Sequence, residues 1–110
     1  DVGDEILKLM SRTIAANIRG KDKLGRWGGE EFLAVIKTDQ IDVLKRIANK
    51  LRLLVSKSSL KLDNGKEIKV TVSIGGTIFK ANESITELVK RADEYMYESK
   101  ENGRNKVTIK

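Results

Sequence analysis

Two adjacent carboxylates behind two glycines are the first residues in this sequence that could do chemistry. Gly28 and Gly29 are followed directly by Glu30 and Glu31. Glycines in a tight turn allow positive φ and let a ligand approach the backbone closely. Mg²⁺ takes one or two protein carboxylates and completes its coordination with water and phosphate oxygens. The four residues therefore indicate either a metal site or a solvated acidic turn, and by themselves they favour the turn.

Two cations form a second candidate group. Lys100 and Arg104 bracket the end of a predicted helix. Cations at that end stabilise a helix by about 0.3–1 kcal/mol through its dipole. An ammonium and a guanidinium can also neutralise the charge of a phosphoryl group during its transfer. The spacing is compatible with helix capping and with a triphosphate clamp.

A third group combines a guanidinium with carboxylates. Arg19 precedes Asp22 by three residues, and Asp4 stands near the start of a predicted helix. Arginine can fork onto phosphate or onto guanine, and a carboxylate can accept hydrogen bonds from guanine's amino and imino groups. The alternatives are a surface salt bridge worth about 0–1 kcal/mol and, for Asp4, a helix-start carboxylate.

Composition limits the chemistry further. The 110 residues contain no Cys and no His, so a general base or metal ligand has to come mainly from Asp and Glu. That favours oxygen-binding cations such as Mg²⁺.

The net charge of +6 favours polyanionic partners or is simply a solvated basic surface, and aromatic residues at 5% argue against a nucleic-acid stacking surface. No apolar stretch approaches the roughly 20 residues of a membrane-spanning helix, and no secretory leader is expected.

Apolar spacing predicts three helices that position these groups. The first follows Ile6, Met10, Ile14 and Ile18 and ends near Gly20. The second begins near Asp39 and fades in residues 56–59. The third begins at Ser84, which has the spacing of a capping box with Glu87, and stops at residues 102–103. Residues 95–97 of this helix are expected to pack in the core or at its edge.

Alternating apolar residues predict two hairpins and a last strand. Residues 24–27 and 32–36 flank the glycine pair. Residues 60–62 and 68–74 flank an Asn-Gly turn, where both central residues are expected to have positive φ. Residues 106–109 form the last strand. The order predicts one α+β domain over residues 1–110, an α/β sandwich of one sheet with covering helices.

Together these residues resemble the GGDEF domain of diguanylate cyclases, and the resemblance covers essentially the whole chain. It rests on four stretches in the family's order: residues 3–7 (GDEIL), 26–32 (RWGGEEF), 73–76 (SIGG) and 92–105 (ADEYMYESKENGRN). The resemblance implies a nucleotidyl-cyclase palm-like sheet with covering helices. It also implies an enzyme that joins two GTP molecules into cyclic di-GMP, releases pyrophosphate, uses Mg²⁺ or Mn²⁺, and acts as a homodimer in the cytoplasm.

The resemblance assigns roles by position. Glu30 would be a metal ligand, and Glu31 would bind a second metal or handle the proton of the attacking 3′-hydroxyl. Gly28 and Gly29 would leave room for GTP. Lys100 and Arg104 match the triphosphate-binding pair and Asp4 the guanine-binding aspartate.

The family's inhibitory RxxD motif also has a match. Arg19 and Asp22 stand at the family's distance before the glycine pair, where cyclic di-GMP binds and blocks turnover. In some members an arginine on the helix after the hairpin completes this site from a second domain. Lys50 occupies that position here and keeps the charge but not the bidentate fork.

Family members also carry a strand and a helix with an Asp-x-Asp-x-Phe-Lys-x-x-Asn-Asp stretch before the Gly-Asp opening, and these 110 residues hold no such stretch. The expected fold is therefore N-terminally truncated and lacks its central strand. The 110-residue chain is expected to be inactive alone and to exchange strands, dimerise or aggregate. The rival function is a cyclic di-GMP receptor without turnover, and a weaker one is a basic nucleic-acid-binding domain. Any membrane attachment would come through a sensory region outside these residues.

Overall fold

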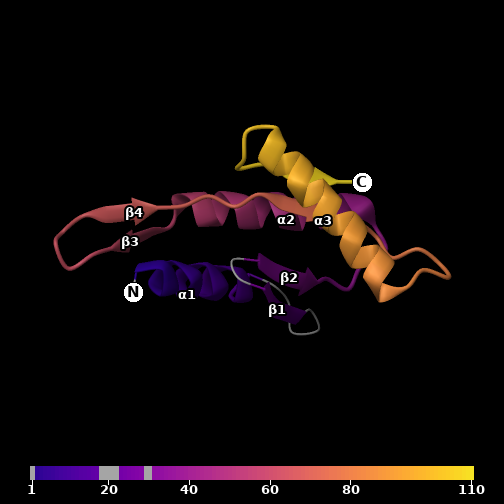
Figure 1. Ribbon diagram of the computed structural model, residues 1–110, viewed down its shortest axis with the longest axis horizontal. Coiled ribbons are helices and arrows are strands. Elements are labelled where there is room, and N and C mark those ends of the chain that lie inside the picture. Colours follow the sequence, from indigo (N-terminus) through magenta and orange to yellow (C-terminus); the bar gives the residue numbers. More distant parts are fainter. Residues whose placement is uncertain (1, 18–22, 29–30) are drawn as a thin grey trace.

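The computed structural model describes residues 2–17, 23–28 and 31–110 (Figure 1). In these residues the helices are separated along the chain by hairpins and short strands. The helices are α1 (Val2–Ala15), α2 (Ile41–Lys57) and α3 (Ile85–Glu101). The strands are β1 (Lys23–Gly28), β2 (Glu31–Val35), β3 (Ser59–Lys61), β4 (Glu67–Lys69), β5 (Ile74–Gly76) and β6 (Val107–Ile109).

The helices lie close to where apolar spacing predicts them. Helix α3 begins after its N-cap Ser84, whose hydroxyl oxygen accepts a hydrogen bond from the Glu87 backbone N–H at 3.1 Å. That confirms the predicted cap. Helix α1 ends at Ala15, earlier than predicted, because the Asn17 N–H turns back to the Ile14 carbonyl and its side-chain amide donates to the Thr13 carbonyl. Ile18 and Gly20, where the helix was expected to end, lie outside the described residues.

The second hairpin is present, but its turn differs from the prediction. Gly65 has a φ of 84°, whereas Asn64 is not among the residues with positive φ. The Gly65 N–H donates to the Leu62 carbonyl at 3.0 Å, and the Leu62 N–H donates to the Lys66 carbonyl at 2.8 Å. These bonds close a three-residue loop that needs one left-handed residue, so the expectation of two was wrong.

The strands form three separate two-stranded ladders where a single sheet was expected. β1 pairs with β2 and β3 with β4, both antiparallel, and β5 pairs with β6 in parallel. The predicted strand over residues 68–74 is divided, because residues 70–73 pair with no strand in the described part of the chain. No described strand bonds to two ladders at once.

Helices nevertheless cover the parallel pair on both sides. α2 and α3 both contact β5 and β6, so this ladder lies between them. α3 approaches so closely that a Cβ on Gly75 would overlap the backbone of Ala92 and Met96. α1 lies along α2 on the side away from the C-terminal end of α3 (Figure 1). This local α/β sandwich confirms the predicted fold class.

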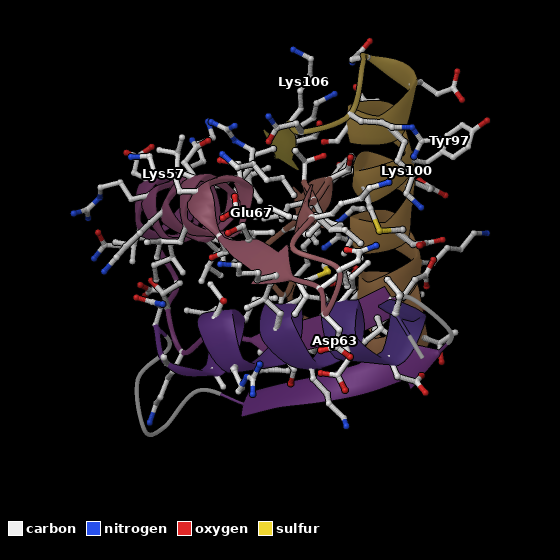
Figure 2. The ribbon with its side chains drawn as sticks, turned by 90° about the vertical axis from the view of Figure 1, so that its left-hand side faces the viewer. Lys57, Asp63, Glu67, Tyr97, Lys100 and Lys106 are labelled. Carbon is white, nitrogen blue, oxygen red and sulfur yellow. The ribbon has the colours of Figure 1, made fainter. Side chains whose placement is uncertain are left out.

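A small core joins α1 and α2 to the divided strand. Ile14, Leu51 and Val55 are buried together, and partly buried apolar side chains pack around them: Met10, Ile47, Val70, Val72 and Ile74. Residues 70, 72 and 74 therefore turn their side chains inward even though residues 70–73 lack a ladder partner, as their alternation predicts. Tyr97, in contrast, was expected to pack and is 62% exposed (Figure 2).

Candidate functional site

The end of α3 presents the two predicted phosphate-binding cations. Lys100 lies half-buried in the last turn, and Arg104 lies exposed just beyond the C-cap Asn102. Figure 2 shows Lys100 on α3, close to the exposed Tyr97. Both cations stand where the helix dipole is negative, so they stabilise the helix whatever else they bind. The structure thus brings Lys100 and Arg104 to one helix terminus, as their spacing predicts.

The turn that carries Arg104 has an unusual backbone. Gly103, Arg104 and Asn105 have φ values of 113°, 63° and 50°. The left-handed region costs a non-glycine residue about 1–2 kcal/mol, and asparagine tolerates it better than most. The Arg104 N–H donates to the Ser99 carbonyl at 3.0 Å, which folds the turn back onto the helix end. Arg104 therefore leaves α3 in a direction set by this turn.

A buried serine fixes the same helix end to the strands. Ser99 is fully buried, and its hydroxyl bonds to the Ile74 carbonyl at 2.9 Å and to the Thr108 hydroxyl at 2.7 Å. These bonds set the rotation of the last turn of α3, and Lys100 is the next residue. Sequence reasoning missed Ser99, although a serine three residues after Met96 in the apolar stripe of the helix was a usable signal.

A second residue that sequence reasoning missed lies on α2. The Arg52 guanidinium Nη1 donates to the Asn105 side-chain oxygen at 3.1 Å and weakly to the Asn105 carbonyl at 3.4 Å. The two residues border an open depression of about 420 Å³ with Asn49, Lys106 and Val107. Their separation of 53 residues left no local pattern to find.

The glycine hairpin is described only in part. In β1 and β2, Gly28 stands opposite Glu31, and the register shifts between Arg26 and Gly28. Glu31 begins β2 and is half-buried. Gly29 and Glu30 lie outside the described residues. The predicted hairpin is confirmed, and the metal-binding role of the two glutamates stays a prediction.

The described residues alone do not assemble a metal centre. Among them, no three side chains of Asp, Glu, His or Cys lie close enough together to hold an ion. Glu31 supplies one carboxylate of the predicted pair, and carboxylate oxygen is the donor that Mg²⁺ prefers. The donor chemistry therefore fits the implied metal.

The structure does not bring Asp4 beside the cations of α3. Asp4 is exposed in the first turn of α1, where a carboxylate is favourable with the helix dipole. The start of α1 and the last turn of α3 lie on opposite sides of α2 (Figure 1). The guanine-binding role of Asp4 stays a prediction.

The predicted inhibitory site is represented by one described residue. Arg19 and Asp22 lie outside the described residues. Lys50 is exposed on α2 and borders a shallow groove of about 480 Å³ with other side chains of that helix: Lys45, Arg46, Asn49, Leu53, Leu54 and Lys57. The groove combines positive charge with apolar surface, which suits an anionic ligand that also has flat apolar faces.

A family profile described as diguanylate cyclase, GGDEF domain, matches residues 1–106. The chain belongs to the GGDEF family. "Diguanylate cyclase DosC" of Escherichia coli K12 is 36% identical over 109 residues, covering 99% of this chain and 24% of that protein. "Diguanylate cyclase A" of Treponema denticola is 38% identical over 108 residues, covering 97% of this chain and 29% of that protein. The chain thus spans about a quarter of the length of these GGDEF relatives.

Solved GGDEF structures have the same fold. The GGDEF domain of DgcB from Caulobacter crescentus, solved in complex with c-di-GMP, superimposes with a TM-score of 0.92 at 30% identity. The superposition covers 98% of this chain and 64% of that one. The three ladders and their helices are therefore arranged as in a GGDEF domain. In the described residues, no helix is both long and apolar enough to cross a membrane.

Proposed function

We propose that residues 1–110 are part of the catalytic domain of a diguanylate cyclase, which condenses two GTP molecules into cyclic di-GMP and pyrophosphate in the cytoplasm. The observation that carries the proposal is the end of α3, where Lys100 lies in the last helical turn, Arg104 lies in the turn that follows, and Ser99 holds both to the fold. The family match over residues 1–106 supports the triphosphate of GTP as the ligand of these cations.

The ammonium of Lys100 and the guanidinium of Arg104 bind phosphate oxygens and hold the nucleotide in line for attack. Gly28 and Gly29 leave room beside the hairpin, and Asp4 accepts hydrogen bonds from guanine once the nucleotide spans the site. Glu30 and Glu31 would hold Mg²⁺ or Mn²⁺. When bound, the metal supplies positive charge against the phosphates.

Two such domains face each other in this proposal, each with one GTP. The 3′-oxygen of one nucleotide forms a bond to the α-phosphorus of the other, and the bond from that phosphorus to the bridging oxygen of pyrophosphate breaks. The proton of the 3′-hydroxyl passes to a carboxylate, for which Glu31 is the candidate. The reaction repeated in the opposite sense closes the ring, so a homodimer is required.

Product inhibition belongs to the same proposal. Arg19 and Asp22 bind the phosphates and guanines of cyclic di-GMP, and Lys50 of a second domain adds a charge. Because lysine lacks the arginine fork, we expect this contact to be weaker than in members with arginine there.

The test is calorimetry with a GTP analogue that carries a methylene bridge between its α- and β-phosphates, in the presence of Mg²⁺. Replacing Lys100 or Arg104 with alanine removes a charged hydrogen bond. We therefore expect each variant to bind the analogue at least about tenfold more weakly than the wild type. Lys90→Ala, an exposed cation elsewhere on α3, is the matched control and should bind like the wild type. Equal affinity in all four chains would contradict the proposal.

A cyclic di-GMP receptor without turnover is the second candidate, favoured by the DgcB domain's complex with c-di-GMP. Binding of cyclic di-GMP, lost in Arg19→Ala, without binding of the GTP analogue would support it.

The 110-residue chain lacks the family's Asp-x-Asp stretch, which supplies another metal ligand. We therefore expect it to form no cyclic di-GMP from GTP and Mg²⁺ by itself, and chromatographic detection of the product would contradict this.

A further inference from the structure

The turn that carries Arg104 is held from a different layer of the fold by Arg52. Arg52 lies on α2, half-buried, and its Nη1 donates to the side-chain oxygen of Asn105 at 3.1 Å and, more weakly, to its carbonyl at 3.4 Å. The carbonyl of the next residue, Lys106, accepts a hydrogen bond from the Ile74 N–H at 2.9 Å. This bond stands at the start of the β5–β6 ladder. Arg52 thus holds the point where the turn meets the strands.

This turn needs such support because its backbone is strained. Arg104 and Asn105 both have positive φ, with values of 63° and 50°. Residues in sparsely populated backbone regions persist only where surrounding contacts over-determine them, and such residues gather at functional sites. Ser99 holds the turn on its α3 side, through its carbonyl and the Arg104 N–H. Without Arg52, the Asn105 side would be free to relax and would carry Arg104 with it.

We propose that Arg52 is a positioning residue for triphosphate binding, acting through Asn105 on the direction in which Arg104 leaves the turn. The inference rests on the proposed function, because it takes the triphosphate of GTP as the ligand of Arg104. The Nη1 of Arg52 is engaged by Asn105, and the proposed role needs no contact between Arg52 and a phosphate.

A purely structural role for Arg52 has different consequences. If the bond only attached α2 to the turn, its loss would lower the melting temperature and weaken all ligands alike once the chain began to unfold. A positioning role weakens the ligand that reaches Arg104 and spares the ligand that does not. It also disappears when Arg104 is absent.

The experiment compares Arg52→Met with Arg12→Met in the 110-residue chain, well below both melting temperatures. Arg12 is exposed on α1, so its substitution removes the same charge without touching the turn. Calorimetry uses the methylene-bridged GTP analogue and GMP, both with Mg²⁺. We expect Arg52→Met to weaken the triphosphate ligand several-fold, and by no more than Arg104→Ala does, because it acts only through Arg104. GMP affinity should stay within about twofold, and Arg52→Lys should recover part of the loss because it keeps one donor.

A double-mutant cycle gives the sharpest readout. In an Arg104→Ala background, Arg52→Met should cause no further loss of triphosphate affinity, because coupled residues are not additive. Additive losses, equal weakening of GMP, or an Arg52→Met chain that binds like Arg12→Met would overturn the inference while the proposed function stands. A wild-type chain that does not bind the GTP analogue would overturn both.

Discussion

Glu83 and Arg91 form an ion pair that ties the loop before α3 to the helix itself. Their side chains are only 5% and 17% exposed. Arg91 binds both carboxylate oxygens of Glu83 and also donates to the Ile78 carbonyl at 3.0 Å and the Thr77 hydroxyl at 3.1 Å. Removing one partner would leave the other charge poorly solvated and unpaired. The pair is therefore a stabilising contact rather than a candidate binding site.

Acid should weaken this contact. The hydrogen bond from Arg91, followed by one from the Lys80 N–H, lowers the pKa of Glu83 below its ordinary value of 4.5. A lowered folded-state pKa contributes stability that is complete above the unfolded value and is lost as pH falls through the folded value. We expect the melting temperature of the wild type, followed by circular dichroism, to decrease as the pH drops below about 4.5. Glu83→Gln should lower the melting temperature on the order of 5–10 °C at pH 7. The melting temperature of this variant should also depend less on pH in acid.

Glu98→Gln is the control for this substitution. Glu98 pairs with Lys110 at 2.9 Å, but the two side chains are 44% and 57% exposed, and such pairs contribute little. We expect its melting temperature to stay within about 2 °C of the wild type at pH 7. Equal losses in the two variants would show that burial of the Glu83 pair does not matter.

At the scale of elements, α3 can pack closely on β5 because Gly75 has no side chain. A Cβ on Gly75 would overlap the backbone of Ala92 and Met96, which cannot move without displacing the helix. Gly75→Ala should therefore destabilise the chain by about 3 kcal/mol, at the upper end of overpacking effects. Because α3 ends in Lys100, affinity for the GTP analogue should fall as well. Urea denaturation and calorimetry measure the two effects.

Gly25→Ala separates this effect from a general effect of replacing glycine in a strand. A Cβ on Gly25 meets no atom within 4 Å, and its φ is not in the left-handed region. We expect its free energy of unfolding to stay within about 0.5 kcal/mol of the wild type. A similar loss in both variants would mean that contact with α3 is not the cause.

Helices were predictable because their signals are local. The Ser84 cap and the apolar spacing of α2 and α3 lie within a few residues of the positions they determine. Lys100 and Arg104 are also joined by one helix end, so their proximity followed from their spacing. Residues whose partners are distant in the sequence were missed: Ser99 meets Ile74 across 25 residues, and Arg52 meets Asn105 across 53.

Ladders were less predictable, because strand pairing is decided by a partner elsewhere in the chain. Alternation correctly predicted that Val70 and Val72 turn inward, yet residues 70–73 form no ladder in the described residues. The Asn-Gly pair correctly predicted a hairpin, but its loop length, and not its two residues alone, determined the turn. Sequence patterns thus indicated which face is buried before they indicated which strands pair.

For the whole molecule, the separation of the described strands into three ladders is accompanied by a small core and an elongated shape. The described chain measures 52 × 32 × 24 Å, and its radius of gyration of 14.4 Å exceeds the roughly 13 Å typical of a domain near this length. Its buried apolar side chains are Ile14, Ala48, Leu51, Val55 and Ile109. A core of this size leaves the stability of the 110-residue chain sensitive to any partner that covers its strand edges.

Such edges are templates for another strand, and a second copy of the chain is the partner always present in solution. We therefore expect the purified 110-residue chain to dimerise or aggregate as its concentration rises, with a melting temperature that rises with concentration where dimers form. Thr71→Pro removes a backbone donor in the middle of residues 70–73 and should shift the chain towards monomer in light scattering. Thr71→Ser keeps that donor and should associate like the wild type. A wild-type chain that stays monomeric at all concentrations, or equal association in both variants, would show that this edge does not mediate self-association.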